Sequence, residues 1–224
     1  VFANTVDRFL EDRGIDQVTY VGAAMGGQVG LTLALEHPDR LERLALVSPA
    51  GIETFTEKDA ATLTATTTAD GIAQSTDEQV KKSVAANFDT WSADYAWLIE
   101  QREALSERDD FMDYAAANAK AVEGMLNGAV ADRLGEVQPP TLVLFGAGDK
   151  LIPNPYLHPK QTTADIAQAA EKALPNAEGS STPKSDPCNV SNLPGSNSRT
   201  PSTYRGASAG SPPLRRISTS SSST

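Results

Sequence analysis

Apolar residues recur along residues 1–178 in two alternating patterns, one typical of buried strands and the other of helices. Short runs that are almost wholly apolar predict strands at 17–21, 41–47 and 141–145. Runs with apolar residues three or four positions apart predict helices at 1–13, 26–36 and 165–174. Strands this apolar, separated by helices, predict an α/β fold with a parallel sheet covered on both faces.

Between the second and third predicted strands the pattern is helical throughout. Ser75 and Glu78 have the spacing of a capping box, and apolar stripes follow it in three successive helices. Helices inserted between two strands of one sheet predict a cap over the carboxyl ends of those strands. The aromatic residues Phe88, Trp91 and Trp97 lie in this insertion, either as lining of a substrate pocket or only as core. The predicted organisation is core at 1–51, cap at 52–136 and core at 137–178.

The composition changes near residue 179, where serine, threonine, proline and glycine begin to dominate and apolar periodicity ends. Such a segment buries too little apolar surface to offset the entropy of ordering it, so residues 179–224 are predicted to be a disordered tail. The same stretch turns from acidic to basic, which also fits a sequence read in a shifted frame.

Charge and composition exclude several classes of function. The chain has 224 residues, a net charge of −10 and a pI near 4.7, which argues against nucleic acid or an anionic membrane as partner. No apolar run approaches the roughly 18 residues of a membrane span, and no signal peptide is visible, so we expect a cytoplasmic protein. The single cysteine, Cys188, and two histidines, His37 and His158, leave little basis for a metal site. We expect neither a metal nor a cofactor.

The first predicted strand runs into a glycine-rich turn, "VGAAMGG", that opens a helix. One interpretation is a dinucleotide fingerprint, with Gly22, Ala24 and Gly27 in a G-x-A-x-x-G variant. That fingerprint needs an acidic residue at the end of the next strand, which here ends Val47-Ser48-Pro49. The other interpretation is a nucleophile elbow, G-x-S-x-G, with Ala24 in place of the serine. Its glycines at 22 and 26 are expected where a Cβ would clash.

The stretch "VTYVGAAMGGQVGLTLALEHPDRLERLALVSPAG" resembles the elbow and flanking strands of the α/β-hydrolase superfamily, and "PPTLVLFGAGDKLIP" resembles its strand and loop that carry the triad acid. The resemblance covers residues 1–178. It implies a partial doubly wound sheet of the α/β-hydrolase type. It also implies that Ala24 occupies the nucleophile position, that the Met25 backbone N–H is the first oxyanion donor, and that Asp149 is the acid. Asp149 is alternatively a turn-forming aspartate.

Two parts of the family pattern are missing from the sequence. The catalytic histidine should follow residues 173–178, where no histidine is found, and His158 lies too near Asp149 to be that base, although it is a candidate to line the pocket. The family's first four strands would precede Val1, so a fragment is expected. Without those strands the edge of the strand at 17–21 is bare, which predicts self-association and poor solubility as a monomer.

The resemblance implies relatives that hydrolyse an ester or a related carbon–carbon or epoxide bond of a small apolar substrate, through a Ser-His-Asp triad and without a cofactor. Since Ala24 replaces the nucleophile and no catalytic histidine follows, this chain is expected to be inactive. The alternatives are a non-catalytic binding or scaffold protein and a dinucleotide-binding oxidoreductase.

Overall fold

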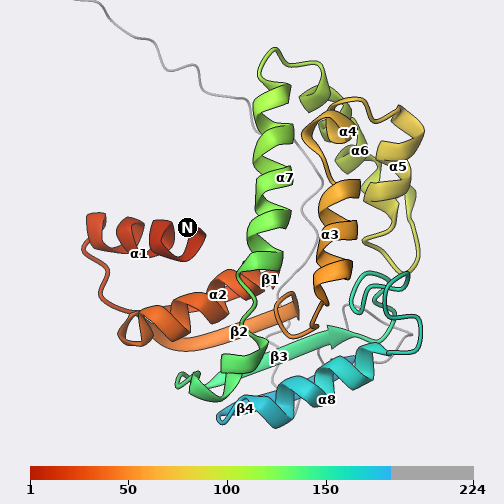
Figure 1. Ribbon diagram of the computed structural model, residues 1–224. Coiled ribbons are helices and arrows are strands. Elements are labelled where there is room, and N and C mark those ends of the chain that lie inside the picture. Colours follow the sequence, from red (N-terminus) through yellow and green to blue (C-terminus); the bar gives the residue numbers. More distant parts are fainter. Residues whose placement is uncertain (183–224) are drawn as a thin grey trace, which may run out of the picture. The chain divides into compact units, whose positions relative to one another are not determined.

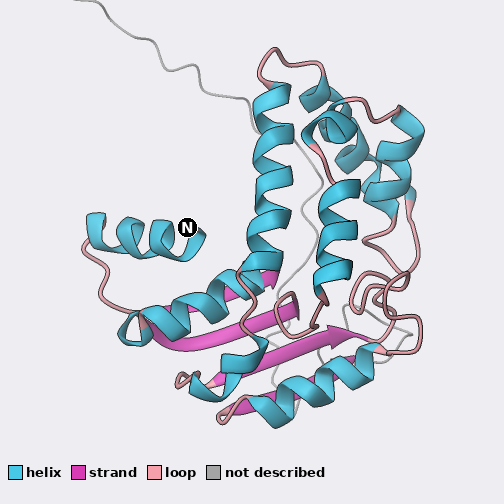
Figure 2. Ribbon diagram, viewed as in Figure 1, coloured by secondary structure: helices cyan, strands magenta, loops and turns pink. Residues whose placement is uncertain are grey.

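The computed structural model describes residues 1–182, in which a parallel sheet carries an inserted group of helices (Figure 1, Figure 2). Within these residues the sheet has four strands in the order β1-β2-β3-β4, and each strand runs parallel to its neighbours. The strands are β1 (Val18–Ala24), β2 (Leu41–Pro49), β3 (Thr141–Gly146) and β4 (Ala177–Thr182). All three predicted strands are present, each extended by one to three residues at its carboxyl end.

Two helices pack on this sheet, and a third packs against one of them. Helix α2 (Met25–Glu36) connects β1 to β2 and packs on both strands, α1 (Phe2–Asp12) packs against α2, and α8 (Thr163–Ala173) packs on β3 and β4. The short 3-10 helices η1 (Pro38–Arg40) and η3 (Ala131–Glu136) precede β2 and β3. The helix positions follow the predicted apolar periodicity within two residues.

The buried core lies on one face of the sheet. Leu44 and Leu46 of β2 are fully buried and pair in register with residues of β3, whereas Val47, which points to the other face, is exposed. Val21 of β1 is 68% exposed on that same open face. The sequence predicted helices on both faces, but the helices of residues 1–182 cover only one. The strand order follows the chain order without reversal, so successive crossovers of one hand place their helices on the same side.

The insertion between β2 and β3 is helical, as its periodicity predicted. These inserted helices are α3 (Glu57–Thr66), α4 (Ala69–Ala73), α5 (Asp77–Ala85), α6 (Ala96–Ser106) and α7 (Phe111–Asn127), with the 3-10 turn η2 (Ala93–Tyr95) before α6. The predicted capping box is displaced by one residue, because Thr76 caps α5 and exchanges hydrogen bonds with Gln79. Thr76 begins a turn in which its hydroxyl reaches the backbone of the third helical residue, which Ser75 does not.

The described part of the chain ends in β4. Residues 179–182 belong to β4, which pairs with β3 as far as Gly146. The serine-rich segment of the sequence therefore begins within β4, which pairs with β3 through backbone hydrogen bonds. The rest of the predicted tail, 183–224, lies outside the described residues. Among residues 1–182, no helix has the length and apolar character to cross a membrane.

Candidate functional site

The elbow between β1 and α2 has the sharp backbone that the glycine pattern predicts. Ala24 has φ 48° and ψ −122°, a conformation that alanine seldom adopts, and helix α2 begins at the next residue. The Ala24 carbonyl accepts a hydrogen bond from the Ala50 N–H at 3.0 Å, which ties the elbow to the loop that follows β2. A strained turn held by its neighbours is typical of a functional site. Here the turn presents a methyl group.

Two glycines allow this turn, and one of them differs from the prediction. A Cβ on Gly22 would lie 2.4 Å from the Gly26 carbonyl oxygen, as expected for the strand side of the elbow. A Cβ on Gly26 would meet nothing within 4 Å, so the expected clash there is wrong. The tight helix-side contact falls on Gly27, whose added Cβ would lie 2.6 Å from Pro49 Cβ. Gly27 lets α2 approach the end of β2, and Gly26 faces open space.

Tyr20 supports the elbow from the covered face of the sheet. Its hydroxyl donates to the Gly26 carbonyl at 2.9 Å, and its ring lies where a Cβ on Gly22 or Gly30 would be. Burial raises the pKa of Tyr20, so the phenol stays protonated and keeps donating this hydrogen bond. The first turn of α2 is thereby fixed relative to β1.

Met25 is the first residue of α2, so its backbone N–H is one of the helix donors that have no acceptor within the helix. Its side chain is 36% exposed and lines a cavity beside Ala24. The partial positive charge of a helix amino terminus favours an oxygen that carries negative charge. The oxyanion role of this N–H stays a prediction that the resemblance implies.

Asp149 lies in the loop after β3 and caps that loop with one carboxylate oxygen. Its Oδ1 accepts hydrogen bonds from the backbone N–H groups of Leu151 at 2.9 Å and Ile152 at 3.0 Å. Its own N–H donates to the Gly146 carbonyl at 3.0 Å. Asp149 is therefore a turn-forming aspartate, as the alternative interpretation held. Because Oδ1 makes both of these bonds, Oδ2 is the oxygen that would orient a base.

Two cavities meet at Ala24. The Asp149 cavity, of about 370 Å³, brings Ala24 and Asp149 together with Ser48 and Phe88. The Phe55 cavity, of about 530 Å³, brings Ala24 and Met25 together with residues of α3 and α7. Both are lined by the carboxyl ends of strands on one side and by the inserted helices or their loops on the other. The structure thus unites the elbow and the acid loop beneath the insertion.

The predicted aromatic lining is present only in part. Phe88 lines the Asp149 cavity, and its ring stacks on Tyr95 with the centroids 4.5 Å apart. Trp91 packs edge-on against Phe88 at 5.5 Å and is 36% exposed, while Trp97 in the first turn of α6 is 51% exposed. Neither tryptophan lines a cavity beside Ala24. Trp91 supports Phe88 from the outside, and Trp97 faces solvent.

His158 also lies outside both cavities. Its Nδ1 is in hydrogen-bond contact with Glu53 Oε1, and its Nε2 lies 4.0 Å from Asp59 Oδ2. Its ring stacks on Phe55 with the centroids 5.5 Å apart. Two carboxylates from the loop and helix that follow β2 thus hold this imidazole behind the cavity wall. His37, near the end of α2, lies 3.8 Å from Asp7 of α1, at the contact between these two helices.

Three further residues at the site, Glu53, Ser48 and Lys150, were not predicted from sequence patterns. Glu53 is buried and also accepts a hydrogen bond from the Asn154 N–H at 2.7 Å. Ser48 has φ 41° and lines the Asp149 cavity. Lys150 donates to the carbonyl oxygens of Phe88, at 3.3 Å, and of Asp89, which joins the acid loop to the inserted helices. These contacts of Glu53 and Lys150 link residues 61 to 101 positions apart, so no local pattern reveals them.

Comparison with known proteins identifies the family of this arrangement. A family model described as alpha/beta hydrolase fold matches residues 1–178. The chain is 26% identical over 161 residues to a 2-hydroxy-6-oxo-6-phenylhexa-2,4-dienoate hydrolase of Comamonas testosteroni, covering 68% of this chain and 54% of that protein. It is 29% identical over 166 residues to a 2-hydroxy-6-oxononadienedioate/2-hydroxy-6-oxononatrienedioate hydrolase of Klebsiella pneumoniae, covering 67% and 52%. The chain spans about half the length of these curated relatives.

Solved structures share the fold. A probable hydrolytic enzyme from Pseudomonas aeruginosa superposes with a TM-score of 0.69 at 21% identity, covering 81% of this chain and 61% of that one. A serine hydrolase from the polyaromatic-hydrocarbon-degrading bacterium Cycloclasticus zankles gives 0.60 at 21% identity, covering 80% and 60%.

Proposed function

Because the chain belongs to the family of the alpha/beta hydrolase fold, we propose that it binds a small apolar carbonyl compound beside Ala24 without cleaving it. The observation that carries the proposal is the methyl side chain at the tip of a fully formed elbow. A methyl group cannot attack a carbonyl carbon or form an acyl intermediate. Loss of the nucleophile alone lowers the turnover of a serine hydrolase roughly a million-fold.

The remaining groups of the site are suited to binding. The Met25 N–H at the start of α2 is placed to donate to the carbonyl oxygen of a ligand. Phe55, Leu63 and Leu126 provide apolar walls for the rest of the molecule. The Comamonas relative is named as a hydrolase of 2-hydroxy-6-oxo-6-phenylhexa-2,4-dienoate, which is an aryl ketone. This similarity supports an aromatic carbonyl compound as the ligand class.

Within residues 1–182, neither histidine is placed to act as the base. His37 pairs with Asp7 at the far end of α2, and His158 is held by Glu53 and Asp59. Neither histidine lines the Asp149 cavity or the Phe55 cavity. Restoring the hydroxyl by Ala24→Ser is therefore expected to leave ester hydrolysis at the level of buffer, because nothing removes its proton.

The test measures binding and turnover on the same preparation. Titration calorimetry with butyrophenone, an aryl ketone that presents a carbonyl oxygen, should show saturable binding, while p-nitrophenyl butyrate should be hydrolysed no faster than in buffer. Leu63→Trp fills the Phe55 cavity and should weaken butyrophenone binding at least tenfold. Leu98→Trp is the matched control, because Leu98 lines a separate cavity among the inserted helices.

Three outcomes would contradict the proposal. Saturable hydrolysis of p-nitrophenyl butyrate by the unmodified chain, or strong activity after Ala24→Ser, would establish a catalytic base other than the family's histidine. Equal butyrophenone binding by the Leu63→Trp and Leu98→Trp variants would place the ligand away from Ala24. Circular dichroism of both variants verifies that they are folded.

A further inference from the structure

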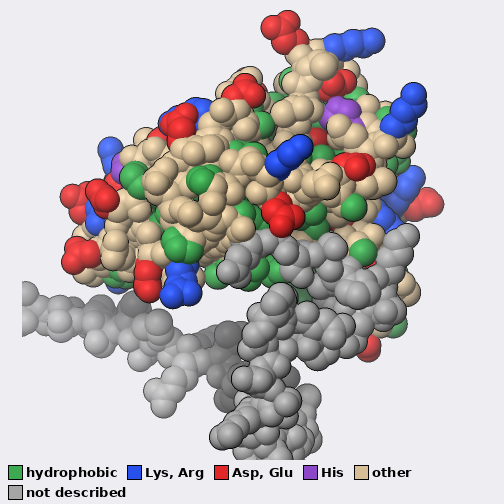
Figure 3. Space-filling model, turned by 90° about the horizontal axis from the view of Figure 1, so that it is seen from below, with side chains coloured by type: hydrophobic (Ala, Val, Ile, Leu, Met, Phe, Trp, Pro, Cys, Tyr) green, Lys and Arg blue, Asp and Glu red, His purple; other side chains and the backbone are tan. Residues whose placement is uncertain are grey.

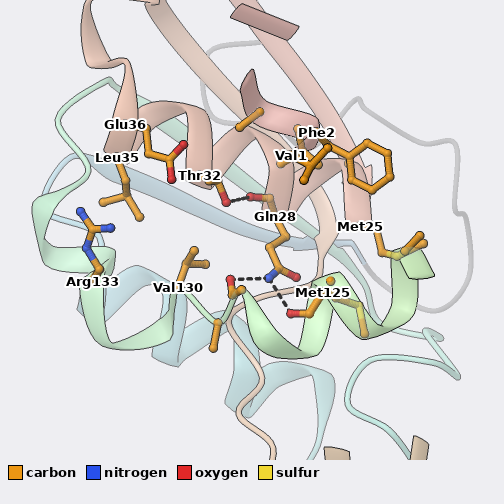
Figure 4. A pocket seen from close by; sticks show the side chains of 17 residues that line it. Val1, Phe2, Met25, Gln28, Thr32, Leu35, Glu36, Met125, Val130 and Arg133 are labelled. Atoms are coloured by element: carbon orange, nitrogen blue, oxygen red, sulfur yellow. Dashed lines mark hydrogen bonds between the residues drawn. The ribbon is translucent and has the colours of Figure 1, made fainter. Parts of the chain in front are cut away.

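A third cavity, of about 540 Å³, lies between α1, α2 and α7 and adjoins the Phe55 cavity, with which it shares Met25, Gln28, Met125 and Ala129. We name it the Gly124 cavity, after a residue that lines it and neither of the two cavities beside Ala24. Its walls are largely apolar, with Phe2, Met25, Val29, Met125 and Val130 among them (Figure 4). The charged residues Glu36 and Arg133 lie at the end away from Met25 (Figure 4). Its size is in the range of small-molecule sites.

Gln28 extends from α2 into this space, and its amide is held in one orientation. The side chain is 6% exposed, and Nε2 donates to the carbonyl oxygens of Met125 at 2.9 Å and Gly128 at 2.8 Å. Carbonyl oxygens only accept hydrogen bonds, so the nitrogen must face them and the amide cannot be flipped. Figure 4 shows the amide oxygen to the right of the nitrogen, on the side of the cavity where Met25 lies.

The oxygen fixed in this way has no partner. Gln28 Oε1 is buried, and no group within residues 1–182 donates a hydrogen bond to it. A buried acceptor without a donor is destabilising, so a ligand that donates one hydrogen bond to this oxygen would be favoured. Met25 and Met125 line the cavity around this amide, and their flexible thioether chains can move to admit a ligand.

The chemistry of the cavity restricts the ligand that would donate this hydrogen bond. An ionised acid, an ester, an ether or a ketone offers only acceptors and would place an oxygen against an oxygen. An ammonium group would have to leave water for apolar walls, which costs more than one hydrogen bond returns. A neutral hydroxyl on an aromatic ring supplies one donor and an apolar body.

We propose that the Gly124 cavity binds a neutral aromatic alcohol whose hydroxyl donates to Gln28 Oε1, with its rings between α2 and α7. The Gly124 cavity adjoins the carbonyl site beside Ala24 and shares Gln28 with it, but the proposal does not depend on the function proposed for that site.

The test compares two probes that differ in the donor alone. By fluorescence titration of the full chain, 2-naphthol should bind at least tenfold more tightly than 2-methoxynaphthalene, which has the same rings and no hydroxyl hydrogen. Gln28→Met removes the acceptor at similar volume, and the ratio of the two affinities should fall to about one. Equal affinity of the two probes for the unmodified chain, or binding of neither probe up to its solubility limit, would overturn the proposal.

A second variant keeps the test decisive if Gln28→Met fails to fold, because Gln28 also joins α2 to α7. A Cβ on Gly124 would meet nothing within 4 Å, so Gly124→Leu fills the cavity without a backbone clash and raises the helix propensity of α7. This variant should lose 2-naphthol binding while keeping its circular dichroism spectrum. Leu98→Trp, which fills a different cavity among the inserted helices, should bind 2-naphthol as the unmodified chain does. Retained binding by Gly124→Leu would contradict the assignment.

Discussion

The sheet region and the inserted helices of this molecule are stabilised in different ways. The large side chains that are fully buried, such as Leu31, Leu44, Val143 and Phe145, belong to the strands, to α2 and to the segments that join them. Helices α3 to α6 bury no residue completely, and α7 buries only Ala115. The insertion instead depends on capping boxes, stacked rings and the contacts of Lys150. Burial specifies the sheet, whereas local hydrogen bonds and a few tertiary contacts specify the helices over it.

The largest expected effect comes from the same deletion made in both regions. Leu44→Ala removes a side chain that is 1% exposed and should lower the free energy of unfolding by about 2–5 kcal/mol. Leu98→Ala in α6 removes a side chain that is only partly buried and should cost about 1 kcal/mol or less, since part of its surface already contacts water. Urea denaturation followed by circular dichroism measures both. Equal losses would mean that the insertion has a core as tight as that of the sheet.

A second comparison separates the two glycines of the elbow. Gly22→Ala places a Cβ against the Gly26 carbonyl, a backbone atom that cannot move aside, and should destabilise by about 1–3 kcal/mol. Gly26→Ala adds a methyl group in open space within a helix and should be neutral or stabilise by up to about 1 kcal/mol. Thermal unfolding of the two variants decides this. A comparable loss in Gly26→Ala would restore the clash that the glycine pattern predicted.

A third comparison uses pH to contrast a helix of the insertion with one of the core. Hydrogen bonds from Thr56 hold the pKa of Asp59 in α3 below its usual value, and those from Thr162 do the same for Asp165 in α8. A carboxyl whose pKa is lower in the folded than in the unfolded state stabilises the protein above about pH 4. This stabilisation is lost as the pH falls through the pKa of the folded state. Asp59→Ala and Asp165→Ala should therefore destabilise at pH 7 and have little effect near pH 2.

The two variants should differ in where the loss occurs. Asp165→Ala should lower the global thermal midpoint, because Ile166 and Ala170 join α8 to the core. Asp59→Ala should mainly speed hydrogen exchange of the α3 amides, since α3 buries no residue completely. A global shift of equal size in both variants would show that α3 unfolds only together with the sheet.

The smallest effect on stability is expected at the open face of the sheet. Val21→Lys changes a side chain that is 68% exposed, so the unfolding free energy should change by less than about 0.5 kcal/mol. A charge on this edge strand should nevertheless reduce self-association. Light scattering of the two chains at matched concentration measures it. An unmodified chain that stays monomeric would contradict the proposed association.

Sequence alone located the sheet and the elbow because their signals are local. Strands as apolar as 41–47 and 141–145 have few other interpretations, and the spacing of Gly22 and Gly26 around Ala24 marks a sharp turn. Helices α3 and α4 gave no such signal, because alanine and threonine leave their apolar faces weak. The cavity lining was predicted less well, since exposure depends on which neighbours a side chain finds. Trp91 packs against Phe88 from outside, and His158 meets a carboxylate 105 positions away.

The backbone of Ala24 also sets a choice for protein engineering. Its φ of 48° is tolerated best by glycine, so Ala24→Gly should relieve strain of about 1 kcal/mol and raise the melting temperature. Serine at the same position would keep the strain and gain only a hydroxyl with no base beside it. Stability therefore favours glycine at position 24, whereas a nucleophile requires serine. The melting temperatures of the glycine, alanine and serine variants would measure the cost in stability of the side chain at this position.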